Sequence, residues 1–224
     1  ISVSIFSEIE SDPSIQTVDA ATKIAKKEKC DFIIGLGGGS PLDVAKAVSV
    51  MVKNSGSVRE YLEKKEIKIA GLPFIAIPTT AGTGTEVTKN SVITNKEKNI
   101  NISLRSFYMI PAVAILDASL TVSLPADITA STGMDALTHA IEAYLSKSAN
   151  QITDILAEKA ICLIAKNLRT AVKCPDDKNA RENMLLASLS AGMAFANAGL
   201  GAVHALAHPL GARFHIPHGV VNAL

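Results

Sequence analysis

The spacing of apolar residues changes along this 224-residue chain, and the change falls near residue 119. Before that point, short apolar runs typical of buried strands alternate with segments of helical period. These runs are Phe32–Leu36, Phe74–Pro78 and Ala112–Leu116. After that point the pattern is helical throughout. We therefore expect an α/β domain over residues 1–118 and an all-helical domain over residues 119–224.

The first half reads as helices alternating with strands. Ser14 is a suitable N-cap for a helix over residues 15–29. A hairpin is expected through Val92–Ile93 and Ile100–Leu104, with its turn at 95–99. Because helices separate the apolar runs, the pattern predicts βαβ units and a mainly parallel, buried sheet. In the second half we expect helices over residues 127–146, 151–173, 178–197 and 201–213.

The composition argues against a nucleic-acid-binding or membrane-bound protein. Apolar residues make up 48% of the chain, as in a packed globular protein, and the net charge of +1 gives no basic stripe for nucleic acid. There is no uninterrupted apolar stretch of about 18 residues and no signal-peptide pattern, so we expect no membrane partner. The three cysteines share no metal-type spacing, which fits a reducing cytoplasm.

All five histidines lie in two short segments, residues 133–144 and 199–219. Asp135 and His139 are four residues apart, so one helix face can direct both at a common centre, and the same spacing relates His204 and His208. A carboxylate and several imidazoles suit a divalent metal such as iron or zinc. Taken singly, each histidine is more typical of an ordinary role on a helix face or at a cap. The gathering of all five in two segments favours the metal site, because histidines without a shared role would be scattered along the chain.

A glycine-rich turn follows the first predicted strand. Gly37, Gly38, Gly39 and Ser40 precede a helix with Pro41 in its first turn, and a helix N-terminus of this kind presents free N–H groups to a pyrophosphate. The pattern is neither GxGxxG nor a Walker loop, so a purely structural turn is also compatible with it.

A second loop, from Thr79 to Thr88, leaves the carboxyl end of the next strand, the edge where open α/β sheets bind ligands. Its five threonine hydroxyls suit a ribose or a phosphate, although an ordinary surface loop would look the same. Asp43, in the helix after the glycines, either favours the helix dipole or accepts a hydrogen bond from a cofactor amide.

Four motifs in this order and spacing resemble the iron-dependent (group III) alcohol dehydrogenases: GGGSPLDVAKAV, PTTAGTGTEVT, GMDALTHAIEAYLS and HALAHPLGARFHIPHG. The resemblance runs from about Asp12 to the C-terminus. It implies a dehydroquinate synthase-like fold, with a dinucleotide-binding α/β domain and a helical metal-binding domain. It also implies a metal between the two domains.

The resemblance also assigns roles to residues of this sequence. It implies that the metal ligands are Asp135, His139, His204 and His218, and that His208 is a proton carrier beside the nicotinamide. His215 stands where the family motif requires no histidine. The implied cofactor contacts are Gly38, Gly39, Ser40, Asp43, Thr79, Thr80 and Thr83.

The implied activity is hydride transfer between a small alcohol or aldehyde and NAD or NADP. Fe²⁺ or Zn²⁺ would lower the pKa of a bound alcohol so that the alkoxide forms near neutral pH. We expect a homo-oligomer. The chain resembles a family member without its first βαβ unit and its last helices, and the missing front would carry the residue that selects between NAD and NADP. A fragment, a truncated gene product or an excised piece would each look this way.

Two other functions remain open at this stage. One is a related enzyme on the same scaffold, such as a glycerol dehydrogenase, a hydroxyacid–oxoacid transhydrogenase or a metal-free maleylacetate reductase, although the full ligand set disfavours the last. The other is a non-catalytic remnant that binds a metal or a partner chain through apolar surface left uncovered.

Overall fold

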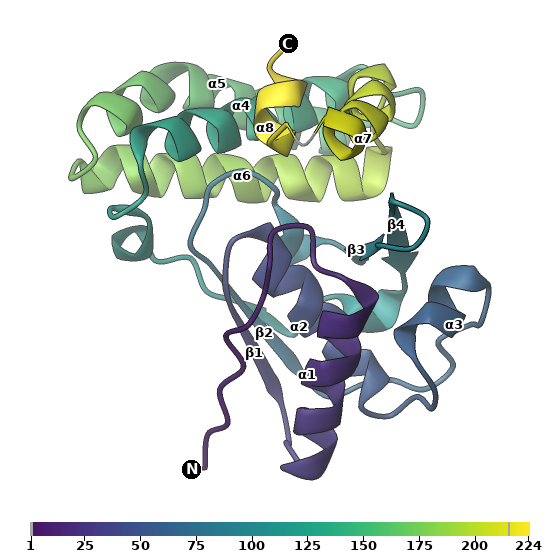
Figure 1. The fold of residues 1–224 in the computed structure, drawn as a ribbon. Helices are drawn as coiled ribbons and strands as arrows, with labels where there is room; N and C mark the ends of the chain where they lie inside the picture. The colour runs from purple at the N-terminus through teal and green to yellow at the C-terminus, as the bar shows by residue number, and fades with distance from the viewer. Residues whose placement is uncertain (1, 215) are drawn as a thin grey trace. The chain divides into compact units, whose positions relative to one another are not determined.

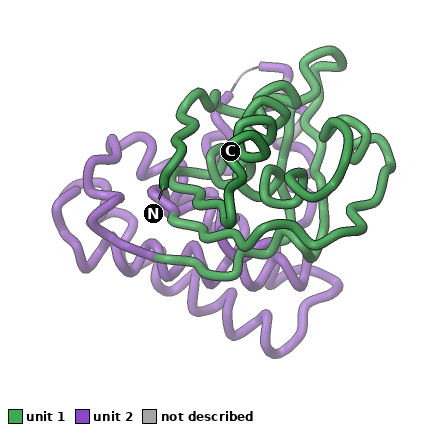
Figure 2. The backbone as a smooth tube through the Cα atoms, turned by 90° about the horizontal axis from the view of Figure 1, so that it is seen from below, with its two compact units in different colours: residues 1–77, 89–115 green, residues 78–88, 116–224 purple. Residues whose placement is uncertain are grey.

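The computed structural model describes residues 2–214 and 216–224, without the side chains of His208 and Ala212, and it divides the chain into two compact units. Unit 1 comprises residues 1–77 and 89–115, and unit 2 comprises residues 78–88 and 116–224 (Figure 2). Figure 1 labels helices and strands of both units. Unit 1 mixes helices and strands, whereas unit 2 is helical. The predicted order, an α/β part followed by a helical part, is confirmed.

Unit 1 is built on a three-stranded sheet of order β1-β2-β5, in which β2 and β5 pair in parallel. An antiparallel hairpin, β3–β4, forms a separate two-stranded sheet. Its elements are α1 (Ile15–Lys27), β1 (Ile33–Gly37), α2 (Gly39–Met51), α3 (Val58–Glu63), β2 (Phe74–Pro78), β3 (Asn90–Asn95), β4 (Ile100–Arg105), the 3-10 turn η2 (Phe107–Met109) and β5 (Val113–Ala114). Ser14 caps α1 through its hydroxyl, as predicted, but α3 was not foreseen and β5 is shorter than the predicted strand.

The prediction that the run Phe32–Leu36 forms a buried strand is wrong for one face of β1. One face packs on α2, where a Cβ on Gly35 would come within 3.0 Å of the side chains of Leu42 and Ala45. The alternate residues Ile34 and Leu36 are more than half exposed. An apolar run reveals that a strand can be buried, but it does not reveal which elements cover each face.

Helix α2 is tied to the hairpin by polar groups that are themselves buried. The Asp43 carboxylate accepts a hydrogen bond from the backbone N–H of Val92 at 2.8 Å, and the Ser91 hydroxyl donates to the Asp43 carbonyl at 2.8 Å. The Lys46 ammonium donates to the Asn90 carbonyl at 2.8 Å. Because buried polar groups are costly unless bonded, these contacts fix the register of α2 against β3.

Unit 2 is a stack of helices in which α4, α5 and α6 pack against one another. Its core is made mainly of alanines with a few larger apolar side chains such as Ile164, Met184 and Leu185. Its elements are the 3-10 turns η1 (Thr85–Val87) and η3 (Ala118–Thr121) and the helices α4 (Ala126–Tyr144), α5 (Gln151–Lys173), α6 (Lys178–Ala198), α7 (Ala202–Phe214) and α8 (His218–Asn222). The first four helices match the predicted ranges within one or two residues, and α8 was not predicted.

The threonine-containing loop, residues 79–88, packs on α6 within unit 2. Gly84 has a left-handed backbone (φ 58°), and a Cβ there would lie 2.7 Å from the Gly192 Cα on α6. A glycine on each side is therefore what lets the two backbones approach.

Among the described residues, no single helix is both long and apolar enough to cross a membrane. Helix α6 together with the first part of α7 passes the same length and composition test, but these two helices meet at a 93° bend.

Candidate metal centre

Asp135 and His139 lie on one face of α4, one turn apart, and both are buried. The His139 Nδ1 lies 3.8 Å from the Asp135 Oδ2. This pair follows directly from the i, i+4 spacing in the sequence, because residues four apart on a helix project in the same direction. His139 is also stacked between two rings, with centroids 4.5 Å from Phe195 and 4.4 Å from His204.

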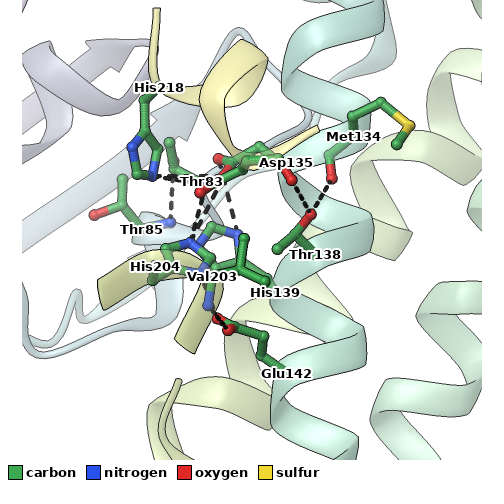
Figure 3. Close-up of polar contacts among 11 residues, drawn as sticks. Thr83, Thr85, Met134, Asp135, Thr138, His139, Glu142, Val203, His204 and His218 are labelled. Atoms are coloured by element: carbon green, nitrogen blue, oxygen red, sulfur yellow. Dashed lines mark hydrogen bonds and ion pairs between the residues drawn. The ribbon is translucent and has the colours of Figure 1, made fainter. Parts of the chain in front are cut away.

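Two further histidines reach this pair from later helices. The Nε2 atom of His204, from α7, lies 3.8 Å from the Asp135 Oδ1, and the Nε2 of His218, the first residue of α8, lies 3.6 Å from the same oxygen. One potential ligand atom from each of Asp135, His139, His204 and His218 lies within 4.8 Å of the others (Figure 3). All four residues belong to unit 2.

Two observations test whether these residues suit a cation. The Nδ1 of His139 is buried and has no hydrogen-bond partner. The amide nitrogen of Asn222 lies within hydrogen-bond distance of three atoms at once, Asp135 Oδ1 at 2.5 Å, His204 Nε2 at 3.1 Å and His218 Nε2 at 3.0 Å. An amide nitrogen has only two N–H hydrogens, so it cannot donate to all three. The Asn222 amide thus takes the place that a cation would take, and the residues fit such a group.

The protonation states also suit a cation. Burial lowers the pKa of His204 to about 4, with a further contribution from His139, and burial likewise lowers the pKa of His139. Burial alone would raise the pKa of the Asp135 carboxyl, but the surrounding imidazoles and the Asn222 amide hold that pKa below its ordinary value. Near neutral pH the buried groups are therefore an anionic carboxylate and neutral imidazoles, the forms in which these side chains bind metals.

Two contacts around the histidines were not predicted from the sequence. Glu142, also on α4, lies 2.6 Å from the His204 Nδ1 and accepts a hydrogen bond from the Val203 backbone N–H. A backbone hydrogen bond joins Gly82 to His139. The sequence did contain a signal for Glu142: it is seven residues after Asp135 and three after His139, so it lies on the same helix face. Nothing in the sequence pattern pointed to Asn222.

The two remaining histidines cannot be placed in the site. His208 lies within the bounds of α7, but its side chain is outside the described part of the chain, and His215 lies outside the described residues altogether. The role of His208 as a proton carrier therefore stays a prediction.

Four of the residues predicted to contact a dinucleotide lie in unit 1. Gly38 is the N-cap of α2 and provides no side-chain cap, and Gly39 and Ser40 begin that helix. The Ser40 hydroxyl accepts a hydrogen bond from the Asp12 backbone at 3.3 Å. The sequence left two roles open for Asp43, and the structure adds a third, since its carboxylate bonds the Val92 backbone.

The other three, Thr79, Thr80 and Thr83, belong to unit 2. All three are partly exposed, and the Thr83 hydroxyl accepts a hydrogen bond from the Thr85 backbone at 3.4 Å. Thr83 and Thr85 are drawn with the histidines in Figure 3. The predicted dinucleotide contacts are thus divided between the two units. The histidine cluster, by which we mean Asp135, His139, His204 and His218, belongs entirely to unit 2.

Comparison with family models gives two matches. Residues 1–118 match a family described as iron-containing alcohol dehydrogenase, and residues 129–224 match the C-terminal part of the Fe-containing alcohol dehydrogenase family. Among curated proteins, the chain is 46% identical over 224 residues to 1,3-propanediol dehydrogenase of Klebsiella pneumoniae. It is 45% identical over the same length to alcohol dehydrogenase 4 of Saccharomyces cerevisiae.

Solved structures of related oxidoreductases also match this chain. A crystal structure of 1,3-propanediol oxidoreductase matches 98% of the chain with a TM-score of 0.94 and 45% identity. Sulfoacetaldehyde reductase from Bifidobacterium kashiwanohense, solved in complex with NAD⁺, matches 98% with a TM-score of 0.96 and 41% identity. The chain covers 57% and 59% of these two structures, and 58% and 59% of the two curated relatives.

Proposed function

Because the chain belongs to the iron-containing alcohol dehydrogenase family, we propose that it takes part in hydride transfer between a small alcohol or aldehyde and a nicotinamide cofactor. The observation that carries this proposal is the convergence of one carboxylate and three imidazoles within 4.8 Å in unit 2. The redox step belongs to the nicotinamide, and the protein provides binding, orientation and electrostatics.

Asp135, His139, His204 and His218 would hold the metal. A divalent cation bound there would polarise the oxygen of the alcohol or carbonyl substrate. The residues themselves contribute one negative charge and three neutral donors, so a divalent cation held there would keep a net positive charge. Their burial would keep bulk water from screening that charge. His218 is the exception, because its side chain is 38% exposed and leaves the site accessible from that side.

The metal is iron in our proposal, because the family model names it. Zinc is the alternative, since the same nitrogen and oxygen donors suit either ion. NAD is the cofactor favoured by the relative solved with NAD⁺, and NADP is the alternative. Gly38, Gly39 and Ser40 at the start of α2 would bind the cofactor phosphates through backbone N–H groups. Asp43, Thr79, Thr80 and Thr83 would provide further contacts.

His208 would carry the alcohol proton between the substrate and solvent, since an imidazole titrates in the useful pH range. We further propose a cytoplasmic location, supported by three cysteines that are all free thiols. Homo-oligomer formation is a further proposal, supported by the apolar face of β1.

The test combines metal analysis with an activity screen. Protein purified without oxygen should contain one iron or zinc ion per chain. A screen of primary alcohols, diols and hydroxyacids against NAD and NADP would then identify the substrate class and distinguish the alcohol dehydrogenase from a glycerol dehydrogenase or a transhydrogenase. His218→Ala should lower metal content and activity together, and a variant that kept both would refute the ligand assignment.

A second candidate is a non-catalytic chain that associates with a partner through an apolar surface. The exposed side chains of Ile34 and Leu36 on β1 favour it. Fluorescence titration with NADH separates the two, because only the dehydrogenase should show saturable nicotinamide binding.

A further inference from the structure

Glu142 connects α4 to the beginning of α7, next to the histidine cluster but outside it. Its side chain is buried. One carboxylate oxygen lies 2.6 Å from the His204 Nδ1, and the other accepts the backbone N–H of Val203 at 2.6 Å (Figure 3). A backbone hydrogen bond also joins it to Gly201. One carboxylate therefore contacts three residues at the beginning of the segment that carries His204.

The contact with His204 fixes which ring nitrogen carries the proton. An ionised carboxylate can only accept hydrogen bonds, so at 2.6 Å the Nδ1 must be the protonated nitrogen. In a neutral imidazole the other nitrogen then has a free lone pair. That nitrogen, Nε2, faces the Asp135 carboxylate at 3.8 Å and accepts a hydrogen bond from the Asn222 amide at 3.1 Å. The ring is thus oriented with its lone pair directed at the centre of the cluster.

We propose that Glu142 is a positioning residue that selects the Nδ1–H tautomer of His204 and holds its Nε2 toward a divalent cation. This inference rests on the proposed function, because it takes the histidine cluster to be a metal site. Glu142 also joins two elements that are distant in sequence, since it lies on the same helix as Asp135 and bonds the first turn of α7. The same side chain therefore sets both the position and the protonation of His204.

A purely structural role for Glu142 predicts different effects of its substitution on stability and on the His204 tautomer. If the carboxylate served only to cap the first turn of α7, its loss would lower stability without changing the tautomer of His204. Glu142→Gln separates these roles, because it keeps the size of the side chain and one acceptor oxygen for Val203. Its amide can donate a hydrogen bond to an unprotonated Nδ1, which favours the tautomer whose Nε2 is blocked by a proton.

Asp177 provides a matched control. Its carboxylate caps α6 by accepting the backbone N–H of Ala180 at 2.9 Å, as Glu142 bonds the first turn of α7, and within the described part of the chain it bonds no histidine. Asp177→Ala should lower the melting temperature and leave metal affinity within twofold of wild type.

The experiment uses the 224-residue chain and measures Zn²⁺ affinity by competition with a chelator, together with the ¹⁵N NMR shifts of the His204 ring in the metal-free protein. We expect Nδ1–H in the wild type, a mixture of tautomers in Glu142→Gln, and a loss of Zn²⁺ affinity of roughly 10–100-fold in both Glu142→Gln and Glu142→Ala.

The outcomes against the proposal are distinct. An Nε2–H tautomer in the wild type would overturn the role of Glu142 without needing any folded variant, and so would unchanged Zn²⁺ affinity in Glu142→Gln. A wild-type chain that binds no Zn²⁺ through its histidines would overturn the metal centre itself, and with it both this inference and the proposed function.

Discussion

The buried polar side chains of the two units have different bonding partners. In unit 1 the buried Asp43 and Lys46 bond to the backbone of β3 and hold α2 in place. In unit 2 the buried Asp135 and His204, together with the partly exposed His218, place three polar atoms around the single amide nitrogen of Asn222. The hydrogen bonds of unit 1 stabilise the fold. In unit 2 several side chains that can bind a metal lie together and share one amide group, which cannot donate a hydrogen bond to all of them.

Metal binding and dinucleotide binding, the two parts of the expected activity, also draw on the two units differently. The whole histidine cluster comes from unit 2, whereas the predicted dinucleotide contacts come from both units. Metal binding should therefore depend on the packing of a single unit. It can be tested separately from cofactor binding.

The largest expected effect comes from the same substitution made in both units. Asp135→Asn removes the one negative charge of the cluster, so Zn²⁺ affinity should fall by on the order of a hundredfold or more, beyond the range typical of outer-shell changes. Asp43→Asn should leave Zn²⁺ affinity within twofold and instead lower the free energy of unfolding by about 1–3 kcal/mol, because it weakens a hydrogen bond to a charged acceptor. Calorimetric titration and chemical denaturation measure the two quantities. Equal metal affinities in the two variants would remove the distinction between the units.

A smaller effect is expected where the threonine loop packs on α6. Gly84→Ala combines a left-handed backbone with a Cβ placed 2.7 Å from Gly192. Gly211 in α7 is the control, because it has no positive φ and a Cβ there would come no closer than 3.4 Å to the Ile216 carbonyl oxygen. We expect Gly211→Ala to be neutral or slightly stabilising and Gly84→Ala to cost about 2–4 kcal/mol. Equal melting temperatures would mean that the loop does not pack closely on α6.

The pH dependence of the metal-free protein should differ between the units. The pKa of His204 is about 4 in the folded state, against 6.5 ordinarily. The unfolded chain therefore binds more protons between pH 6.5 and 4, and unit 2 should lose on the order of 3 kcal/mol of stability as pH falls through that window.

For Glu10 in unit 1, burial opposes ionisation, but hydrogen bonds from Thr17, Ser14 and Lys96 lower its pKa to about 2. Its contribution is present above about pH 4.5 and is lost as pH falls toward 2. In melting curves recorded from pH 7.5 down to pH 2, the stability loss due to His204 should appear first, between pH 6.5 and 4. Glu10→Gln should reduce only the further loss between pH 4.5 and 2. A Glu10→Gln effect confined to pH 5–7 would contradict these assignments.

The sequence predicted local structure well because local rules determine it. The Ser14 cap, the β3–β4 hairpin and the shared helix face of Asp135 and His139 each depend on residues only a few positions apart. The approach of His204 and His218 to Asp135 could be expected only through the family resemblance, because it depends on how α7 and α8 pack.

Other features could not be read from the sequence. The exposure of Ile34 and Leu36 depends on which elements cover each face of the sheet, and an apolar run is the same in both cases. Asp43 looked like a candidate for cofactor binding or for the helix dipole, and its bond to Val92 requires knowing that β3 lies beside α2.

The most direct measurement is a crystal structure of the chain loaded anaerobically with Fe²⁺, with anomalous scattering recorded at the iron edge. The account predicts one anomalous peak, with an oxygen of Asp135 and one nitrogen each of His139, His204 and His218 at about 2.0–2.2 Å, and with the Asn222 amide moved away from that point. A peak bound elsewhere, or no peak while the Asn222 amide keeps its three contacts, would contradict the assignment of this cluster as the metal centre.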